Sequence, residues 1–309
     1  MRKLLGFLVL FVLTCLGFYV SWRSAAPSWQ GQDLRITHKV PDEFDILLLG
    51  DTGSGNEDQK AVAQALEKVC QDSQAQAVFL LGDNFYAHGV SGLDDPQWQT
   101  KFQSMYDTPC VKQLPFYAIL GNHDYQQNPG AQITYTSEHP SWHMPHRFYS
   151  VDFGKRLRVI ALDSNYPDLC GSSSHCNFDF LRESLQADSE EFLVLAHHPI
   201  QSLSAKYPGM PLPSRILRQF LCKVPHLFYM SGHSHHLELR RDEECQLDEV
   251  INGGGGASLY ELRPMEAAVR FAKSTHGFVR LRLRPQTLKI EFWNEQAQNI
   301  FTSERPLTR

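Results

Sequence analysis

The chain has 309 residues, of which 42% are hydrophobic and 20% are charged, with 20 glycines and 17 prolines. This composition is typical of a globular protein and excludes a collagen-like or low-complexity chain. The formal net charge is −5 and the sequence has no basic stripe, which argues against nucleic-acid binding. An anionic substrate would need a local cation such as a metal ion.

The N-terminal segment, residues 1–23, sets the expected compartment. Arg2 and Lys3 precede an uncharged, mostly apolar run over residues 4–22, which as a helix nearly spans a bilayer core of about 30 Å. Positive residues on the short leading side predict that the rest of the chain is exported. We expect a membrane anchor facing the periplasm or exterior, or a secreted protein if residues 1–26 are removed as a signal peptide. No other part of the chain is expected to contact a membrane.

Residues 24–43 are polar and include Pro27 and Pro41, so they are expected to form a linker before a single domain over residues 44–309. In that domain, short apolar runs are typical of strands that are buried on both faces. They cover residues 44–49, 77–81, 116–120, 157–162, 192–196 and 227–230.

Amphipathic stretches between several of these runs predict helices. One covers residues 56–69, with Asn56 as its N-cap and Gln59 three residues later. The others are expected over 98–106, 178–185 and 214–221, and the C-terminal runs 277–284, 287–293 and 299–303 are expected to be antiparallel strands. Alternating strands and helices predict an α/β fold, in which ligands bind beyond the carboxyl ends of the strands.

Besides Cys15 in the apolar run, the chain has an even number of cysteines, and an exported domain favours three disulfides. Of the possible pairings, Cys170–Cys176 and Cys222–Cys245 are the least costly to close, which leaves Cys70–Cys110.

Polar residues follow five of the apolar runs, where they would meet at one edge of the fold. A lone Asp or His after a strand is most often a cap or turn residue, but five coincident cases favour a common site. Carboxylates and imidazoles gathered there would be poorly solvated without a cation, so we expect a site with two metal ions. The five motifs are Asp51-Thr52-Gly53, Gly82-Asp83-Asn84-Phe85-Tyr86, Gly121-Asn122-His123-Asp124, His197-His198-Pro199 and Gly232-His233-Ser234-His235.

This ordered set resembles the metal motifs of the binuclear metallophosphoesterases, over residues 44 to 293. Many such enzymes have His two residues after the first Asp, where this chain has Gly53, and this chain has Tyr86 three residues after Asp83. These features make the set similar to the motifs of the purple acid phosphatases, particularly the tartrate-resistant, type 5-like group. The resemblance implies a calcineurin-like four-layer αββα sandwich with mixed sheets. It also implies an acid phosphatase that hydrolyses small phosphate monoesters.

The resemblance also implies a ligand set. Asp51, Tyr86 and His235 would hold Fe(III), and Asp83 would bridge to a second ion, which is Fe(II), Zn or Mn in the family. The second ion's remaining ligands would be Asn122, His197 and His233, with His198 not a ligand. The two ions would neutralise the phosphate oxygens and activate a water for in-line attack at phosphorus.

Two further residues are expected to act in catalysis. His123 resembles the family histidine that contacts the phosphoryl group or protonates the leaving group. Lys206 stands where tartrate-resistant members have another active-site histidine, and a lysine could alter the pH optimum. The stretch 170–178 is shorter than the loop that represses some mammalian members, so no activation by proteolysis is expected.

Two flanking segments are less specific. Residues 125–147, which include Trp142 and His146, are expected to form a substrate-facing rim or an ordinary surface loop. Residues 253–256 are all glycine, lack the Lys-Ser/Thr of a phosphate-binding loop and predict a tight turn under the site.

Three other functions are compatible with parts of the pattern. The same metal centre could act on phosphodiesters or nucleotide pyrophosphates, because the ions recognise phosphate and the rim selects the rest. Asp51-Thr52-Gly53 also resembles an aspartic-protease triplet, but no second such triplet exists. An exported binding protein without catalysis is disfavoured because all seven ligand positions are filled.

Overall fold

The computed structural model describes residues 33–165, 177–209 and 211–307, and the side chains of 211–215 are not described. The expected N-terminal segment, most of the 170–178 stretch and the Cys170–Cys176 pair lie outside these residues. Within them, no helix is both long enough and apolar enough to cross a bilayer.

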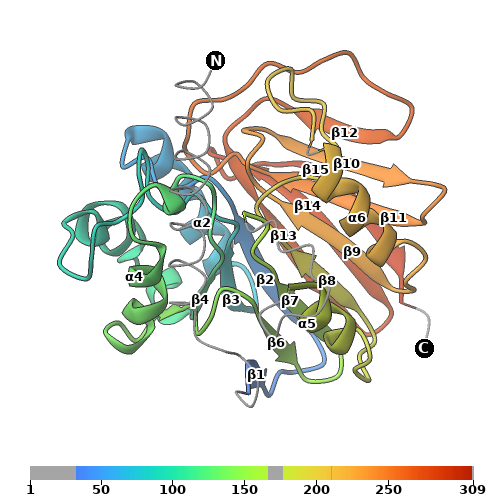
Figure 1. The fold of residues 1–309 in the computed structure, drawn as a ribbon, viewed down its shortest axis with the longest axis horizontal. Coiled ribbons are helices and arrows are strands. Elements are labelled where there is room, and N and C mark those ends of the chain that lie inside the picture. Colours follow the sequence, from blue (N-terminus) through green and yellow to red (C-terminus); the bar gives the residue numbers. More distant parts are fainter. Residues whose placement is uncertain (1–32, 166–176, 210, 308–309) are drawn as a thin grey trace, which may run out of the picture.

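The described residues form two mixed β-sheets that face each other, as the αββα sandwich implied by the resemblance requires (Figure 1). In the first sheet, β2, β3, β4 and β5 are parallel neighbours, and β13, β14 and β15 add antiparallel strands beside β2. Its spatial order is β15 (Asn299–Pro306), β14 (Thr287–Asn294), β13 (Gly277–Leu283), β2 (Phe44–Leu49), β3 (Ala75–Leu80), β4 (Phe116–Ala118) and β5 (Trp142–His143).

The second sheet has eight strands, and its centre consists of the parallel neighbours β7, β8, β9 and β11. The order is β1 (Arg35–His38), β6 (Tyr149–Phe153), β7 (Leu157–Ala161), β8 (Phe192–Leu195), β9 (Leu227–Ser231), β11 (Leu247–Asn252), β10 (Leu237–Asp242) and β12 (Val269–Lys273).

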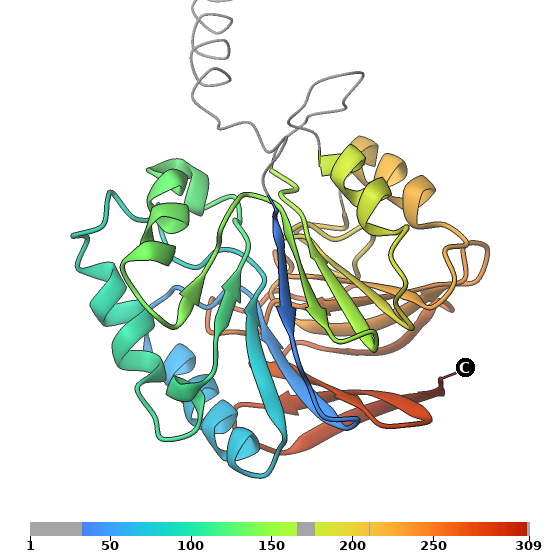
Figure 2. The same ribbon diagram turned by 90° about the horizontal axis from the view of Figure 1, so that it is seen from below.

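Helices cover the outer faces of both sheets, which gives the four layers of the predicted αββα sandwich (Figure 2). The predicted N-cap is confirmed, because Asn56 Oδ1 accepts a hydrogen bond from the amide of Gln59 at 2.9 Å. The α-helices are α2 (Glu57–Gln71), α3 (Ser104–Tyr106), α4 (Pro129–Thr134), α5 (Asn177–Ser184) and α6 (Pro211–Leu221). The remaining helical segments are the π-helix η1 (Trp98–Gln103) and the short 3-10 helices η2 (Val111–Gln113), η3 (Asp124–Gln126) and η4 (Tyr135–Ser137).

Aromatic side chains fill the space between the sheets. Phe44 of β2 stacks on Phe153 of β6 with 5.6 Å between ring centroids, and Phe79 of β3 meets the same ring at 6.2 Å. All three rings are buried. This contact holds the two sheets in a fixed relation, which in turn fixes the loops at the strand ends.

The structure contains strands that the apolar runs did not predict. Residues 35–38, placed in the linker by the sequence, form β1 and pair with β6. Strands β5, β6, β10, β11 and β12 were also missed, because several of them carry buried charges. In β6, Asp152 lies opposite Arg158 of β7, and the two side chains form a bidentate pair at 2.6 Å. Such cross-strand pairs allow charged residues at positions that a search for apolar runs passes over.

Two of the expected disulfides are present. Cys70–Cys110 ties the end of α2 to the segment before η2, and Cys222–Cys245 ties the end of α6 to the turn between β10 and β11. Both predicted pairings are therefore confirmed.

Candidate metal centre

The strand ends that carry the motifs meet at one edge of the sandwich. Leu49 and Leu80 are register partners in one sheet, and Leu195 and Met230 are partners in the other, so the loops that follow them begin at matching heights. The loops of the two sheets are joined directly by a hydrogen bond from the amide of His233, after β9, to Asp51 Oδ2, after β2, at 2.8 Å. The tertiary fold thus brings together residues that are 182 positions apart in the chain.

The backbone at this edge adopts an unusual conformation. Asp51, Asp83 and His233 have φ angles of 59°, 52° and 64°, in the left-handed region that residues with a side chain rarely adopt. Such conformations cluster at functional sites, where the surrounding structure holds them in place. Here they turn the chain sharply after each strand and leave the side chains at the shared edge.

Glycines allow the loops to approach each other closely. A Cβ on Gly232 would lie 2.5 Å from Asp51 Oδ2, and a Cβ on Gly253 would lie 2.3 Å from the carbonyl oxygen of Ser234. Residues 253–256 therefore pass directly beneath the motifs, as the expected turn under the site requires. A side chain at either position would displace a neighbouring motif.

One group of side chains gathers around the phenol of Tyr86. Its Oη lies 2.9 Å from Asp51 Oδ1, 3.0 Å from Asp83 Oδ2 and 3.0 Å from His235 Nε2. Asp51 Oδ1 and His235 Nε2 are themselves 3.2 Å apart. Tyr86 Oη and these three neighbouring atoms are four potential ligand atoms for one ion, and they come from three loops.

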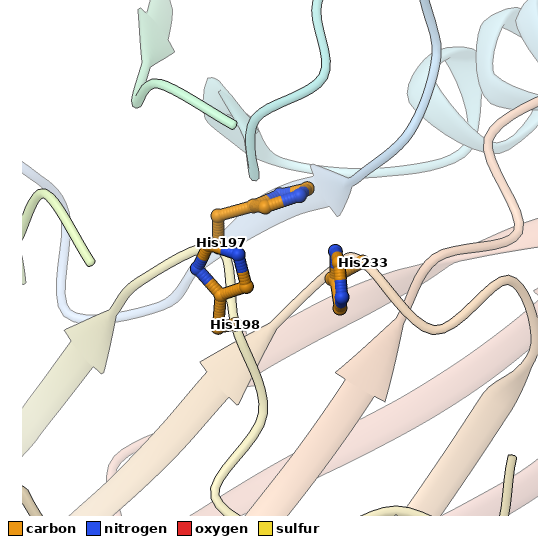
Figure 3. A group of neighbouring side chains, drawn as sticks. All are labelled: His197, His198 and His233. Atoms are coloured by element: carbon orange, nitrogen blue, oxygen red, sulfur yellow. The ribbon is translucent and has the colours of Figure 1, made fainter. Parts of the chain in front are cut away.

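A second group gathers around the amide oxygen of Asn122. Oδ1 lies 2.9 Å from His233 Nδ1 and 3.2 Å from His197 Nε2. Figure 3 shows the imidazoles of His197 and His233 approaching the same space from the segments that follow β8 and β9. His197 Nε2 also lies 3.5 Å from Asp83 Oδ2, the oxygen that faces Tyr86, so this single oxygen touches both groups.

Two backbone carbonyls fix the orientation of the histidines. The carbonyl of Leu81 lies 2.8 Å from His197 Nδ1, and that of Ser258 lies 2.7 Å from His235 Nδ1. Because a carbonyl can only accept, Nδ1 carries a proton in both rings, and Nε2 is left as the nitrogen that faces the site and can bind a metal ion. This arrangement is the usual support of metal-bound histidine.

The electrostatics of the cluster also favour cations. Burial, with the charges of Asp51 and Asp83, holds the pKa of Tyr86 well above its usual range. Burial opposes protonation of His197, but the nearby carboxylate of Asp83 raises its pKa to about 9. Both shifts report the concentrated negative charge of Asp51 and Asp83, and a bound cation would stabilise both carboxylates, replace the second proton of His197 and favour the phenolate of Tyr86.

The residues present fit two metal ions. The donor atoms of Asp51, Asp83 and His235 lie within 4.8 Å of one another, as do those of His197, His198 and His233. The first group, with Tyr86, offers anionic oxygens that suit a hard, highly charged ion. The second group is richer in imidazole, which suits Fe, Zn and other transition metals.

His198 belongs to the second group by distance, although the sequence did not predict it as a ligand. Its Nδ1 contacts Ser164 Oγ at 2.8 Å, and its ring lies 4.5 Å from the ring of His233. Burial, with a contribution from His197, lowers the pKa of His198 to about 3, so the ring is neutral.

His123 lies at the mouth of the site. The ring nitrogen Nδ1 contacts the carbonyl oxygen of Ala87 at 2.6 Å, and Nε2 is 4.0 Å from Asp83 Oδ2, with 32% of the side chain exposed. Its backbone amide also donates to Asp83 Oδ1 at 2.8 Å. Nε2 is therefore the nitrogen that faces the cluster.

Lys206 lies farther out than the sequence predicted. Its Nζ contacts Tyr260 Oη at 3.4 Å and lies over the ring of Tyr260, which in turn stacks on His235. Tyr260 thus contacts both Lys206 and His235.

Two important residues were missed by the sequence analysis. Asp124 is fully buried and accepts hydrogen bonds from the amides of Gly121 and Asn84, at 2.8 and 3.1 Å, so it ties two motifs together. Its place in the third motif was a usable signal. Tyr260, which stacks on His235, follows no motif, and no pattern in the sequence indicates it.

The expected rim over residues 125–147 is only partly exposed. Trp142 is completely buried and packs against Trp98 and Phe85, so it belongs to the core. The prediction that Trp142 faces a substrate is therefore wrong, and its aromatic surface stabilises the fold instead.

Comparisons with known proteins agree with this geometry. A sequence model described as calcineurin-like phosphoesterase matches residues 44–237. Tartrate-resistant acid phosphatase type 5 of Oryctolagus cuniculus is 27% identical over 278 residues, covering 80% of this chain and 84% of that protein.

Two solved structures have the same fold. The purple acid phosphatase PPD1 from yellow lupin (Lupinus luteus) seeds superposes with a TM-score of 0.70 and 18% identity, over 86% of this chain and 54% of that one. GAP50, the anchor in the inner membrane complex of Plasmodium, has a TM-score of 0.76 and 21% identity, over 86% of this chain and 90% of that one.

Proposed function

Because this chain belongs to the calcineurin-like phosphoesterase family and is a hydrolase of phosphoric esters, we propose that it is an acid phosphatase for phosphate monoesters. The observation that carries this proposal is the position of Asp83 Oδ2, which touches both Tyr86 Oη and His197 Nε2. One carboxylate oxygen between two donor groups is the arrangement that a dinuclear centre needs.

The ligands divide between two ions. Asp51, Tyr86 and His235 would hold the first ion, and Asp83 would be shared. We propose Fe(III) as the first ion, because a phenolate is a hard, anionic ligand, and Fe(II), Zn or Mn as the second. The remaining ligands of the second ion would be Asn122, His197 and His233, because Asn122 Oδ1 lies next to a ring nitrogen of each of these two histidines. His198 would support these ligands without binding the ion.

When bound, the two ions would neutralise phosphoryl oxygens and lower the pKa of a water for in-line attack. His123 would then act on the substrate through Nε2. If the carbonyl of Ala87 accepts the proton of Nδ1, a protonated Nε2 can donate to a phosphoryl oxygen or to the departing alkoxide. The hydrogen bond from its amide to Asp83 keeps the ring next to the shared carboxylate.

Metal analysis with a visible spectrum tests this proposal most directly. We expect about two metal ions per chain, including iron, a coloured protein, and hydrolysis of p-nitrophenyl phosphate that is lost on treatment with a strong chelator. A colourless, iron-free protein that keeps its activity and stability after chelation would overturn the proposal.

The substrate class is tested by a second comparison. We expect p-nitrophenyl phosphate to be a better substrate than bis-p-nitrophenyl phosphate. A preference for the diester would assign the centre to phosphodiesters or nucleotide pyrophosphates instead.

We also propose that the domain is exported and, unless cleaved, held at a membrane by its N-terminal segment. The two disulfides support an oxidising compartment. Fractionation of the full chain should place it with membranes in a carbonate-resistant form, or in the medium or periplasm if it is cleaved. Recovery in the cytosol with free thiols would contradict export.

A further inference from the structure

Two tyrosines and a lysine cover one side of the candidate metal centre. Tyr260 stacks on His235, with centroids 4.1 Å apart and planes 14° from parallel, and Tyr207 lies 4.5 Å from the ring of His233. Each tyrosine therefore contacts a histidine from a different metal group. The two tyrosine rings meet at 5.6 Å in an edge-to-face arrangement.

The ammonium of Lys206 lies over both tyrosine rings. Its Nζ is 4.5 Å from the centroid of Tyr260 and 5.1 Å from that of Tyr207. Tyr260 therefore contacts both the imidazole of His235 and the ammonium of Lys206. Cation–π attraction and the contact with Tyr260 Oη, at 3.4 Å, hold the charge in place.

The backbone that carries this lysine is fixed to the rest of the domain. Ser204 forms an antiparallel bridge with Leu262, and the amide of Ala205 donates to the carbonyl of Glu261 at 2.9 Å. The hydroxyl of Ser204 accepts hydrogen bonds from the amides of Lys206 and Tyr207. The position of Lys206 relative to the histidines is thus set by main-chain contacts.

The charge of Lys206 is not neutralised by the protein. The side chain is exposed, and among the described residues no carboxylate lies within 4.0 Å of its Nζ. By contrast, Arg263 on the facing strand segment pairs with Glu266 at 3.2 Å. The tyrosines hold the ammonium but, being neutral, leave its charge available to an anion.

We propose that Lys206, Tyr207 and Tyr260 form a subsite that binds a second anionic group of the substrate, next to the phosphoryl group held at the metal centre. The inference rests on the proposed function and deepens it, because it assigns a preference for phosphate monoesters whose alcohol part carries a negative charge. Lys206 acts in this subsite as a residue that determines specificity, rather than as the acid that protonates the leaving group.

Two matched substrates test the proposal in the metal-loaded protein. Phenyl phosphate and 4-carboxyphenyl phosphate share the phosphoryl group and the ring, and they differ by one carboxylate. We expect the wild-type protein to favour the carboxylated ester by about three- to fivefold in kcat/KM, mostly through KM, which is the size of one exposed charge contact. Raising the salt concentration should reduce this preference.

Substitutions at position 206 should change the preference in a set order. Lys206→Met should bring the ratio of the two kcat/KM values to about one, Lys206→Arg should keep most of it, and Lys206→Glu should reverse it. The matched control is Lys112→Met, an exposed lysine of η2 that pairs with Asp107. That control should leave the ratio unchanged.

Binding provides a readout that does not depend on turnover. Calorimetric titration with phenylphosphonate and 4-carboxyphenylphosphonate should show the same order of preference in wild type and variants. A preference that survives in Lys206→Met, or equal values for both ligands in wild type, would overturn the subsite. Failure of the wild type to hydrolyse either ester would instead count against the proposed phosphatase activity, and the phosphonate titrations would still decide the subsite.

Discussion

The phenol of Tyr86 lies within hydrogen-bonding distance of the carboxylate of Asp83, with 3.0 Å between Oη and Oδ2. In a loaded centre the same phenol would be a phenolate ligand of Fe(III), whose charge-transfer absorption colours the protein. Tyr86→Phe should therefore abolish the visible band and weaken binding of the first ion by at least about tenfold.

Visible spectra and metal analysis of the Tyr86→Phe protein check this prediction. The second ion should remain, because its ligands are unchanged. Tyr135→Phe, which removes a hydroxyl that contacts Gln103 away from the cluster, is the control and should keep the colour. A band that persists without the Tyr86 hydroxyl would show that the phenolate is not a ligand.

His123→Ala should keep both metals but lower kcat by about 10²- to 10⁴-fold, the usual contribution of a positioned acid or hydrogen-bond donor. The reason is that Nε2 faces the cluster while Nδ1 contacts the carbonyl oxygen of Ala87. His88→Ala is a suitable control, because His88 is an exposed histidine of the loop after β3 and contacts Gln126, three residues from His123. Steady-state kinetics with unchanged kcat in His123→Ala would exclude the role.

Gly232→Ala should disrupt metal binding although it replaces no ligand side chain. The new Cβ would lie 2.5 Å from Asp51 Oδ2, so either the carboxylate or the loop must move. We expect a loss of bound metal and activity, with a stability loss of about 1–3 kcal/mol. Gly92→Ala, where a Cβ meets nothing within 4 Å, should retain metals, activity and Tm. Full metal content in Gly232→Ala would mean that the loop has more freedom than this contact implies.

Glu249 should make the stability of the protein depend on pH. The residue is buried beneath residues 200 and 201, whose amides donate to its carboxylate. Burial raises its pKa to about 8, although Arg240 opposes the shift. Between about pH 4.5 and 8 the folded state then holds a proton that the unfolded state has lost, so this group makes the free energy of unfolding fall as the pH rises.

Denaturant unfolding at several pH values checks this prediction. Glu249→Gln should remove a slope of up to ~1.4 kcal/mol per pH unit over that window and gain stability relative to wild type toward pH 8. Glu304→Gln, on the edge strand β15, should unfold with the wild-type pH dependence. Parallel curves for wild type and Glu249→Gln would show that Glu249 is ionised throughout.

The central strands and the motif residues were predictable because their signals are local. An apolar run such as residues 44–49 has few alternatives to a buried strand, and the polar residues directly after it must lie at its carboxyl end. The charged strand β10 gave no such signal. Its Glu238 and Arg240 are buried in contact with each other, at 3.2 Å, and their acceptability depends on neighbours that the local sequence does not reveal.

The sequence by itself therefore determined the α/β class, the candidate ligands and the family, because these depend on residue types and on spacings within a few positions. Only the tertiary structure decided that one oxygen of Asp83 touches both groups, that Trp142 is buried in the core and that Lys206 lies over Tyr260. These relations depend on how two sheets pack face to face. Distances between loops that are far apart in the chain are set by that packing, and no local pattern encodes them.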